Sequence, residues 1–151
     1  ASGGVLRPVT LKRQVGKVPG KQVLSGEIVH QINALLEQVV SADGTAQRAA
    51  VPAYRVAGKT GTVHKVSPNG GYEADHYQSL FVGFAPVSAP RFVLAVMVDE
   101  PRGKYFGGEV AAPVFARIMA DALRMHGIRP DADLDSGVTV VASISPGENG
   151  A

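Results

Sequence analysis

The chain has 151 residues, of which 45% are hydrophobic and 19% charged, so it is large and apolar enough for one globular domain with a core. Its net charge of +2 does not indicate a nucleic-acid partner, and the absence of cysteine excludes disulfides and thiolate zinc sites. The longest apolar run, 92–98, is far shorter than the roughly 20 residues that cross a bilayer.

Two elements are predicted in the first third of the chain. Residues 5–11 have the pattern of a short strand, which Pro8 confines to an edge or irregular position. Ser25 is suited to cap a helix that carries Glu27 in its first turn. This helix is expected over about 25–40. Its apolar residues recur at helical spacing: Ile28, Ile32, Leu35, Leu36, Val39 and Val40.

Three strands in an antiparallel meander are predicted next. The first is 54–63, and a turn cluster at 67–71 separates it from strands at 77–85 and 91–98. The third strand is apolar on both faces, which is typical of a central strand covered by helices above and below. Because the 77–85 strand is its one obvious neighbour, its other edge is expected to pair with backbone from outside the chain.

A second helix is predicted from Gly108 to a stop at Gly127. Its apolar stripe consists of Val110, Val114, Phe115, Ile118, Met119, Ala122 and Leu123. Residues 131–151 have little periodicity and are expected to form a flexible C-terminal tail behind a domain portion at 1–130. The sequence therefore predicts an α+β fold, in which an antiparallel sheet packs against helices.

The most specific motif is Lys59-Thr60-Gly61, because a Lys-Thr-Gly triad is one of three motifs that build a penicilloyl-serine active site. In a strand, Lys59 and Gly61 share one face while Thr60 and Thr62 share the other. Gly61 lets an extended substrate backbone come close, and the Thr62 N–H is suited to donate to an oxyanion. Lys59 supplies positive potential for a carboxylate, which the two threonine hydroxyls can bind. The alternative is a β-branched strand with an ordinary solvated lysine.

Two other polar groupings are not interpreted as catalytic. Ser67-Pro68-Asn69 spells the Ser-x-Asn motif of the same class of active site, but it follows the Lys59 strand too closely to form an opposite wall. Asp99 and Glu100 are adjacent at the end of a strand, where neighbouring side chains point apart, so they are interpreted as a loop rim.

Residues 53–60 match a relaxed phosphate-loop pattern, which is rejected on mechanical grounds. Such a loop needs a buried strand before it and a helix directly after it, so that free N–H groups converge on the phosphates. Pro52 interrupts the strand position, Tyr54 and Arg55 are bulky, and a turn cluster follows instead of a helix.

No metal site or cofactor is predicted. Asp131, Asp133 and Asp135 imitate the start of a calcium loop, yet Ser136 replaces its glycine and Ala142 stands where its glutamate belongs, so the segment is interpreted as a solvated tail. Paired ligand spacing is absent from the histidines, which are His30, His64, His76 and His126.

The sequence resembles the class B penicillin-binding proteins, in particular the division-septum peptidoglycan D,D-transpeptidase of Gram-negative bacteria. The resemblance rests on residues 6–11, 54–62, 84–86 with 90–92, and 105–108 with 112–115. It implies part of the penicillin-binding transpeptidase and serine β-lactamase-like fold, with the Lys-Thr-Gly strand at one edge of a five-stranded sheet beside the catalytic cleft.

The resemblance also implies roles for individual residues. A serine attacks the penultimate D-alanine of a D-Ala-D-Ala stem peptide, and β-lactams acylate the same serine. Lys59, Thr60 and Thr62 then bind the carboxylate of substrate or drug beside Gly61, and the Thr62 N–H completes the oxyanion hole. The apolar wall near the acyl chain is implied to consist of Tyr105, Phe106 and Gly107.

No Ser-x-x-Lys occurs in the sequence, so we expect the nucleophile on an N-terminal part of the same protein and expect the chain alone to be inactive. The resemblance implies the periplasmic side of the bacterial inner membrane and divisome membrane proteins as partners. Two alternatives stay open, a serine β-lactamase or D,D-carboxypeptidase relative and a catalytically inactive binding module, and a nucleotide-binding domain of the P-loop kind is kept as a third despite its mechanically unfavourable motif.

Overall fold

The computed structural model of the chain describes residues 1–8, 11, 15–16, 18–67 and 70–132. In chain order, the elements are β1 (Val5–Leu6), β2 (Lys21–Gln22), α1 (Gly26–Gln38), a 3₁₀ turn at Gln47–Ala49, β3 (Ala57–Val66), β4 (Tyr72–Ala85), β5 (Phe92–Asp99) and α2 (Gly107–Met125). Over this part of the chain, neither helix is both long and apolar enough to span a bilayer. The fold is α+β, as predicted.

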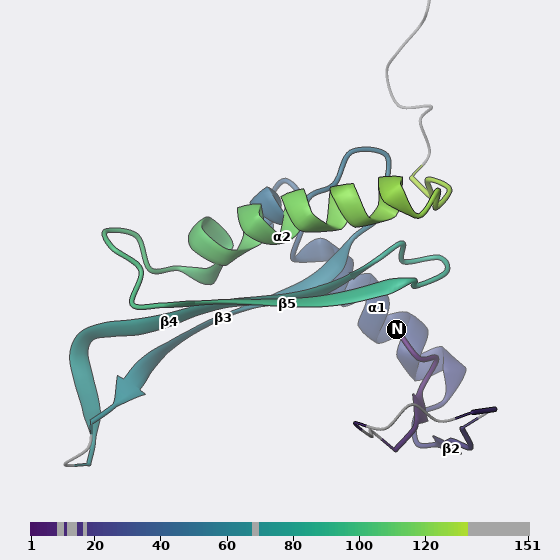
Figure 1. Cartoon of the computed structure of the whole chain (residues 1–151), viewed down its shortest axis with the longest axis horizontal. Helices are drawn as coiled ribbons and strands as arrows, with labels where there is room; N and C mark the ends of the chain where they lie inside the picture. The colour runs from purple at the N-terminus through teal and green to yellow at the C-terminus, as the bar shows by residue number, and fades with distance from the viewer. Residues whose placement is uncertain (9–10, 12–14, 17, 68–69, 133–151) are drawn as a thin grey trace, which may run out of the picture.

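The main sheet is the predicted antiparallel meander, in the order β3-β4-β5 (Figure 1). Its register is continuous from Ala57↔Phe84 to His64↔Tyr77 in the first pair of strands. β4 begins five residues earlier than predicted, and β3 begins three residues later. Ala53 has a φ of 67°, and a bridge between Val51 and Tyr54 closes a tight turn, so Tyr54 and Arg55 precede the strand instead of opening it.

The predicted strand at 5–11 is reduced to β1, which pairs with β2 in a separate two-stranded sheet beside α1 (Figure 1). Positions 9–10 of that prediction lie outside the described residues, as do Pro68 and Asn69 of the predicted turn cluster. Ser67 and Gly71, on either side of those two positions, are joined by a backbone hydrogen bond of 3.1 Å.

α2 covers one face of the sheet (Figure 1). Phe81 of β4 and Phe115 of α2 meet edge to face, with ring centroids 4.8 Å apart at 70°, and both are fully buried. Met119 and Leu123 extend this core along the helix. As predicted, Gly127 ends α2: it has a φ of 58°, and the Ile128 N–H donates back to Leu123 O.

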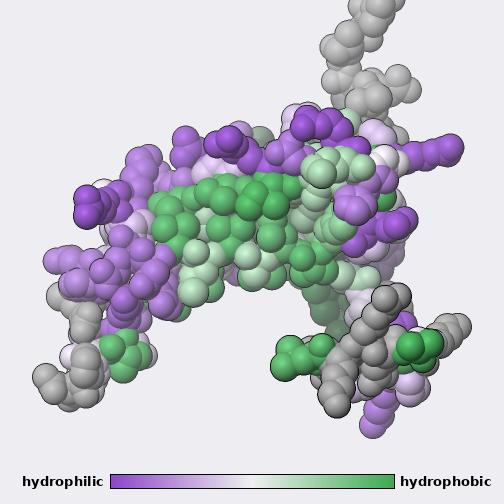
Figure 2. Space-filling view, in the orientation of Figure 1, coloured by the Kyte–Doolittle hydropathy of each residue, from purple (hydrophilic) through white to green (hydrophobic). Residues whose placement is uncertain are grey.

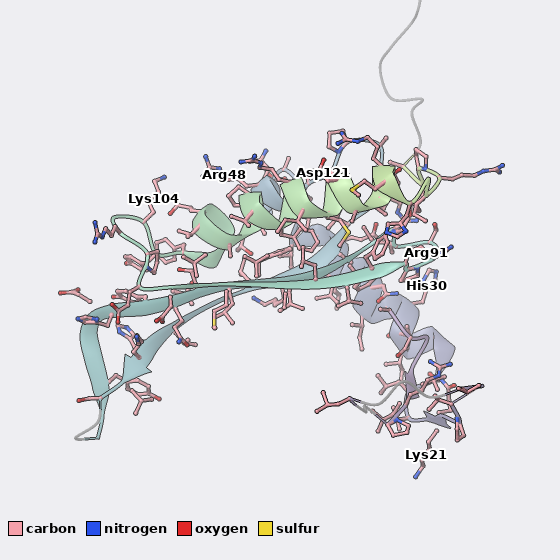
Figure 3. All side chains as sticks on the ribbon, in the orientation of Figure 1. Lys21, His30, Arg48, Arg91, Lys104 and Asp121 are labelled. Atoms are coloured by element: carbon pink, nitrogen blue, oxygen red, sulfur yellow. The ribbon has the colours of Figure 1, made fainter. Side chains whose placement is uncertain are left out.

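Pro113 lies inside α2, where it cannot donate to the carbonyl of Glu109 four residues earlier. The guanidinium of Arg48 donates to that oxygen instead, at 3.2 Å, and so connects the 3₁₀ turn to the helix (Figure 3). The helix therefore continues past Pro113, and the carbonyl oxygen of Glu109 still has a hydrogen-bond donor.

α1 begins as predicted, because the Ser25 hydroxyl accepts the Ile28 N–H and Glu27 lies in the first turn. The helix packs on the opposite face of the sheet from α2. There Leu36 contacts a small cluster of Ala57, Phe84 and Val87. Much of the predicted apolar stripe stays exposed, and Leu35 is 63% exposed.

The prediction that β5 is covered on both faces is wrong within the described residues. Phe92, Leu94 and Val96 pack beneath α2, whereas Val93 and Met97 on the other face are 63% and 60% exposed. β5 pairs with β4 alone among the described strands, so it lies at an edge of this sheet. Figure 2 shows the resulting hydrophobic band below the polar outer surface of α2.

Candidate functional site

The Lys-Thr-Gly motif lies in the middle of β3, at the rim of the sheet. Among the described strands β3 pairs only with β4, so its second edge is open to an added strand. Lys59 and Gly61 are on the face opposite α2, and Thr60 and Thr62 are on the α2 face. The predicted alternation of these four residues is confirmed. Residues 57–60 lie in a strand instead of a phosphate loop, which supports the rejection of that motif.

The Lys59 ammonium stays close to the backbone of β3. Its Nζ donates to the carbonyl oxygen of Thr60 at 3.1 Å and lies 3.4 Å from the Thr60 hydroxyl. The same hydroxyl is 3.4 Å from the hydroxyl of Thr45, which precedes the 3₁₀ turn. One cation and two hydroxyls therefore gather at the strand, a set of donors suited to a carboxylate. Thr45 was not predicted, because no local pattern marks it.

Thr62 connects β3 to the start of α2. Its Oγ1 accepts the N–H of Gly107 at 3.1 Å, which satisfies a donor of the first helical turn. Gly107 is buried, and a Cβ there would lie 2.2 Å from Leu80 O and 2.6 Å from Gly61 O. Only glycine allows this approach. The structure thus brings together two residues predicted for the site from segments 45 residues apart.

The loop before α2 contributes an aromatic row, which we define as His64, Tyr77, Tyr105 and Phe106. Tyr105 stacks on Tyr77 with ring centroids 4.1 Å apart at 11°. The ring centroid of Phe106 lies 4.5 Å from that of Tyr105, and the ring centroid of His64 lies 4.4 Å from that of Tyr77. The buried hydroxyl of Ser79 donates to the carbonyl oxygen of Tyr105 and holds the loop on β4. The row begins beside Thr62 and continues along β3.

The sequence did not predict Tyr77 and His64 as residues of the site. They are direct cross-strand partners, on the same face as Thr62, so the signal lay in the β3–β4 register and not in any local motif. Desolvation, followed by the nearby Tyr105 and Asp75, raises the pKa of the Tyr77 hydroxyl above its ordinary value.

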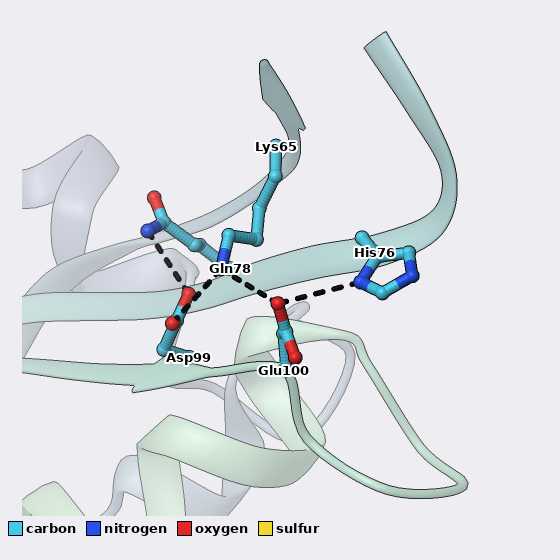
Figure 4. Close-up of polar contacts among 5 residues, drawn as sticks. All are labelled: Lys65, His76, Gln78, Asp99 and Glu100. Carbon is cyan, nitrogen blue, oxygen red and sulfur yellow. Dashed lines mark hydrogen bonds and ion pairs between the residues drawn. The ribbon is translucent and has the colours of Figure 1, made fainter. Parts of the chain in front are cut away.

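A charged cluster lies at the outer end of the sheet (Figure 4). The Lys65 ammonium is 3.1 Å from Asp99 Oδ2 and 2.6 Å from Glu100 Oε1. Gln78 donates to Asp99 Oδ1 at 3.1 Å, and His76 Nδ1 is 3.3 Å from Glu100 Oε1. We call these five residues the Lys65 cluster. Among the described residues, no histidine or acidic side chains form a group suited to a metal ion.

Asp99 and Glu100 lie about half exposed where β5 passes into the following loop, as expected of a loop rim, but the expectation that their side chains point apart is wrong. Glu100 has a φ of 48°, so strand alternation no longer applies and both carboxylates reach the same lysine. The hydrogen bond from Gln78, then that from Lys65, lowers the pKa of Asp99. The hydrogen bonds from Lys65 and His76 lower the pKa of Glu100, and the bonds that Lys65 donates to Glu100 and then to Asp99 raise the pKa of Lys65.

Arg55 and Asp131 hold the entrance to β3. The Arg55 guanidinium forms a bidentate pair with Glu37 of α1 at 2.8 and 2.7 Å. The Asp131 carboxylate accepts the backbone N–H of Arg55 at 2.7 Å and that of Ser88 at 3.0 Å. Ala132 N–H donates to the carbonyl oxygen of Ala53. Asp131 is thus bound to the fold, and its interpretation as solvated is wrong, while 133–151 lie outside the described residues.

Comparison with known proteins gives a consistent result. The family model described as "Penicillin binding protein transpeptidase domain" matches residues 1–120. The chain is 47% identical over 137 residues to the "Probable peptidoglycan D,D-transpeptidase PbpC" of Pseudomonas aeruginosa, covering 90% of this chain and 24% of that protein. It is 42% identical over 132 residues to the "Peptidoglycan D,D-transpeptidase FtsI" of Escherichia coli, covering 87% of this chain and 22% of that protein.

Among solved structures, the chain is similar to the apo transpeptidase domain of Burkholderia pseudomallei penicillin-binding protein 3. The TM-score is 0.75 at 44% identity, and the match covers 87% of this chain and 40% of that one. The chain spans about a quarter of the length of the curated relatives named above. Sequence and fold agree over most of its length, and the chain belongs to the penicillin-binding protein transpeptidase domain family.

Proposed function

We propose that the chain is the part of a serine D,D-transpeptidase that binds peptidoglycan stem peptides along β3 and is a target of β-lactams. The observation that carries the proposal is the open edge of β3, where Lys59, Thr60 and Thr62 lie beside the aromatic row. An extended peptide can add to such an edge through main-chain hydrogen bonds.

In the proposed complex, the terminal carboxylate of D-Ala-D-Ala binds the Lys59 ammonium and the hydroxyls of Thr60 and Thr62. The N–H of Thr62 donates to the developing oxyanion, and one such donor contributes about 3 kcal/mol to transition-state stabilisation. A Cβ at Gly61 would meet only Leu80 side-chain atoms, at 3.4 and 3.6 Å, so nothing within the described residues requires a glycine there. Close approach of the substrate explains it.

The nucleophilic serine is proposed to come from another part of the same protein. Its Oγ bonds to the carbonyl carbon of the penultimate D-alanine, and the peptide bond to the terminal D-alanine breaks. The terminal D-alanine leaves with the proton from the serine hydroxyl on its amine. The amine of a neighbouring stem peptide then displaces the serine. The chain's residues hold the substrate and stabilise charge in both steps. We propose the periplasmic side of the inner membrane as the location, with divisome membrane proteins as partners.

Labelling with a fluorescent penicillin tests the proposal on the complete domain, meaning this chain together with the part that supplies the serine. We expect a stable acyl adduct in the complete domain and none on this chain alone. Lys59→Met is expected to lower the acylation rate about 10- to 100-fold, because a charge-assisted hydrogen bond is lost. Arg124→Met, which removes the exposed Arg124–Asp121 pair of α2, is the matched control.

Other outcomes separate the alternatives. Rapid release of the label supports a β-lactamase or carboxypeptidase relative. A complete domain that takes no label contradicts the proposal and leaves the inactive binding module. Equal labelling rates of wild type and Lys59→Met contradict the role proposed for Lys59 but not the proposed function of the domain.

A further inference from the structure

The regular pairing of β3 with β4 stops at Lys65. His64 pairs with Tyr77 and Val66 pairs with Tyr72, so Lys65 is opposed by the four residues 73–76 of β4. An irregularity of this kind bends the strands and re-aims side chains. The hairpin bends away from the plane of the sheet at this end (Figure 1). At this point the substrate-binding strand depends on other contacts for its position.

The Lys65 cluster supplies such contacts. From β3, the Lys65 side chain reaches past β4 to both carboxylates at the end of β5 (Figure 4). The carboxylates are themselves held, because Gln78 donates to Asp99 and His76 lies against Glu100. Glu100 N–H also donates to Tyr77 O at 2.9 Å, which prolongs the β4–β5 ladder despite a positive φ. All three strands are thus joined where the regular ladder ends.

We propose that Lys65 is a positioning residue for long substrates, because its pairing with Asp99 and Glu100 fixes the outer end of β3. This inference rests on the proposed function. If the substrate carboxylate binds at Lys59–Thr62, the aromatic row shows which way the rest of the ligand runs: along β3 toward His64 and Val66. A long acyl chain reaches the segment that Lys65 holds, and a short ligand ends before it.

The test compares two β-lactams on the complete domain. Piperacillin carries an extended acyl side chain, and 6-aminopenicillanic acid carries none. Lys65→Met is expected to lower the second-order acylation rate with piperacillin about three- to fivefold, as the loss of an exposed ion-pair network predicts. The rate with 6-aminopenicillanic acid is expected to stay within about twofold. Lys65→Arg should restore most of the loss, and Arg124→Met should change neither rate.

Equal losses for the two ligands would mean that Lys65 has only a general structural role, and unchanged rates for both would also overturn the inference. Hydrogen exchange gives a readout independent of acylation. The amides of Val66 and Ser67 should exchange faster in Lys65→Met and at the wild-type rate in Arg124→Met. A wild-type domain that takes no label contradicts the proposed function, while the exchange rates still decide whether Lys65 holds the hairpin.

Discussion

The Thr62 hydroxyl accepts the backbone N–H of Gly107 at 3.1 Å, so the middle of β3 is bonded to the first residue of α2. Through this bond, α2, which carries the main core, fixes the position of Thr62, the threonine proposed to bind the carboxylate. It also fixes the preceding residues, Tyr105 and Phe106, next to β3. Stability and the proposed substrate binding are therefore coupled at this contact.

Thr62→Val tests that coupling. Valine keeps the shape of the side chain but removes the acceptor, which leaves the buried Gly107 N–H unsatisfied. We expect the free energy of unfolding of the complete domain to fall by about 1–3 kcal/mol in urea denaturation. Thr62→Ser keeps the oxygen and should lose much less. An equal loss in both variants would show that the methyl group, and not the hydrogen bond, matters.

Two glycines of the site are predicted to respond in opposite ways to alanine. Gly107→Ala forces a Cβ to 2.2 Å from Leu80 O, so we expect a loss of about 1–3 kcal/mol of stability. Gly61→Ala meets only ordinary contacts and should keep the wild-type stability, yet it should slow acylation by penicillin.

Gly26→Ala is the matched control for both glycine variants, since no atom lies within 4 Å of its added Cβ. Thermal unfolding and acylation rates measured on the three variants separate the two effects. Normal acylation in Gly61→Ala would remove the argument that this glycine makes room for a ligand.

Tyr77→Ala should disturb the aromatic row by removing the ring on which Tyr105 stacks. We expect acylation by a penicillin with an aromatic side chain to slow about three- to tenfold. Tyr77→Phe keeps the ring and should behave like wild type. A loss in Tyr77→Phe as large as that in Tyr77→Ala would show that the hydroxyl carries the effect.

The Lys65 cluster predicts a dependence of stability on pH. Asp99 and Glu100 have lowered pKa values in the folded protein. Their contribution to stability is therefore fully present above their pKa values in the unfolded chain, about 4, and is lost as the pH falls through their pKa values in the folded protein. The Lys65 pKa is raised, so its contribution is present below its unfolded value and is lost only as pH rises through the folded one.

The difference in melting temperature between wild type and Lys65→Met should therefore be constant from about pH 6 to 9 and shrink below about pH 4. Asp99→Asn combined with Glu100→Gln should abolish the difference across this range. A difference that persists unchanged at pH 3 would mean that the lysine acts through packing instead of charge.

Local patterns predicted much of this architecture. The Ser25 cap, the stop at Gly127 and the alternation of Lys59 with Thr60 each depend on neighbours within a few residues, and each is confirmed. The strand meander followed from turn residues and apolar runs. These features have strong local physical causes, so one sequence suffices to predict them.

What the sequence did not reveal depends on register and on distant partners. Tyr77 joins the aromatic row because of its pairing with His64, and Asp99 meets Lys65 only across β4. The apolar pattern of β5 correctly indicated a strand but not which of its faces this chain covers. The roles proposed for the Lys-Thr-Gly residues remain predictions until the acylation experiments are made.

The carboxylate of Asp131 accepts N–H groups from both Arg55 and Ser88. Detachment of this one side chain deprives two amides of their acceptor, one at the entrance to β3 and one in the connection between β4 and β5. Segments remote in sequence are therefore expected to open as a single cooperative unit that Asp131 holds closed.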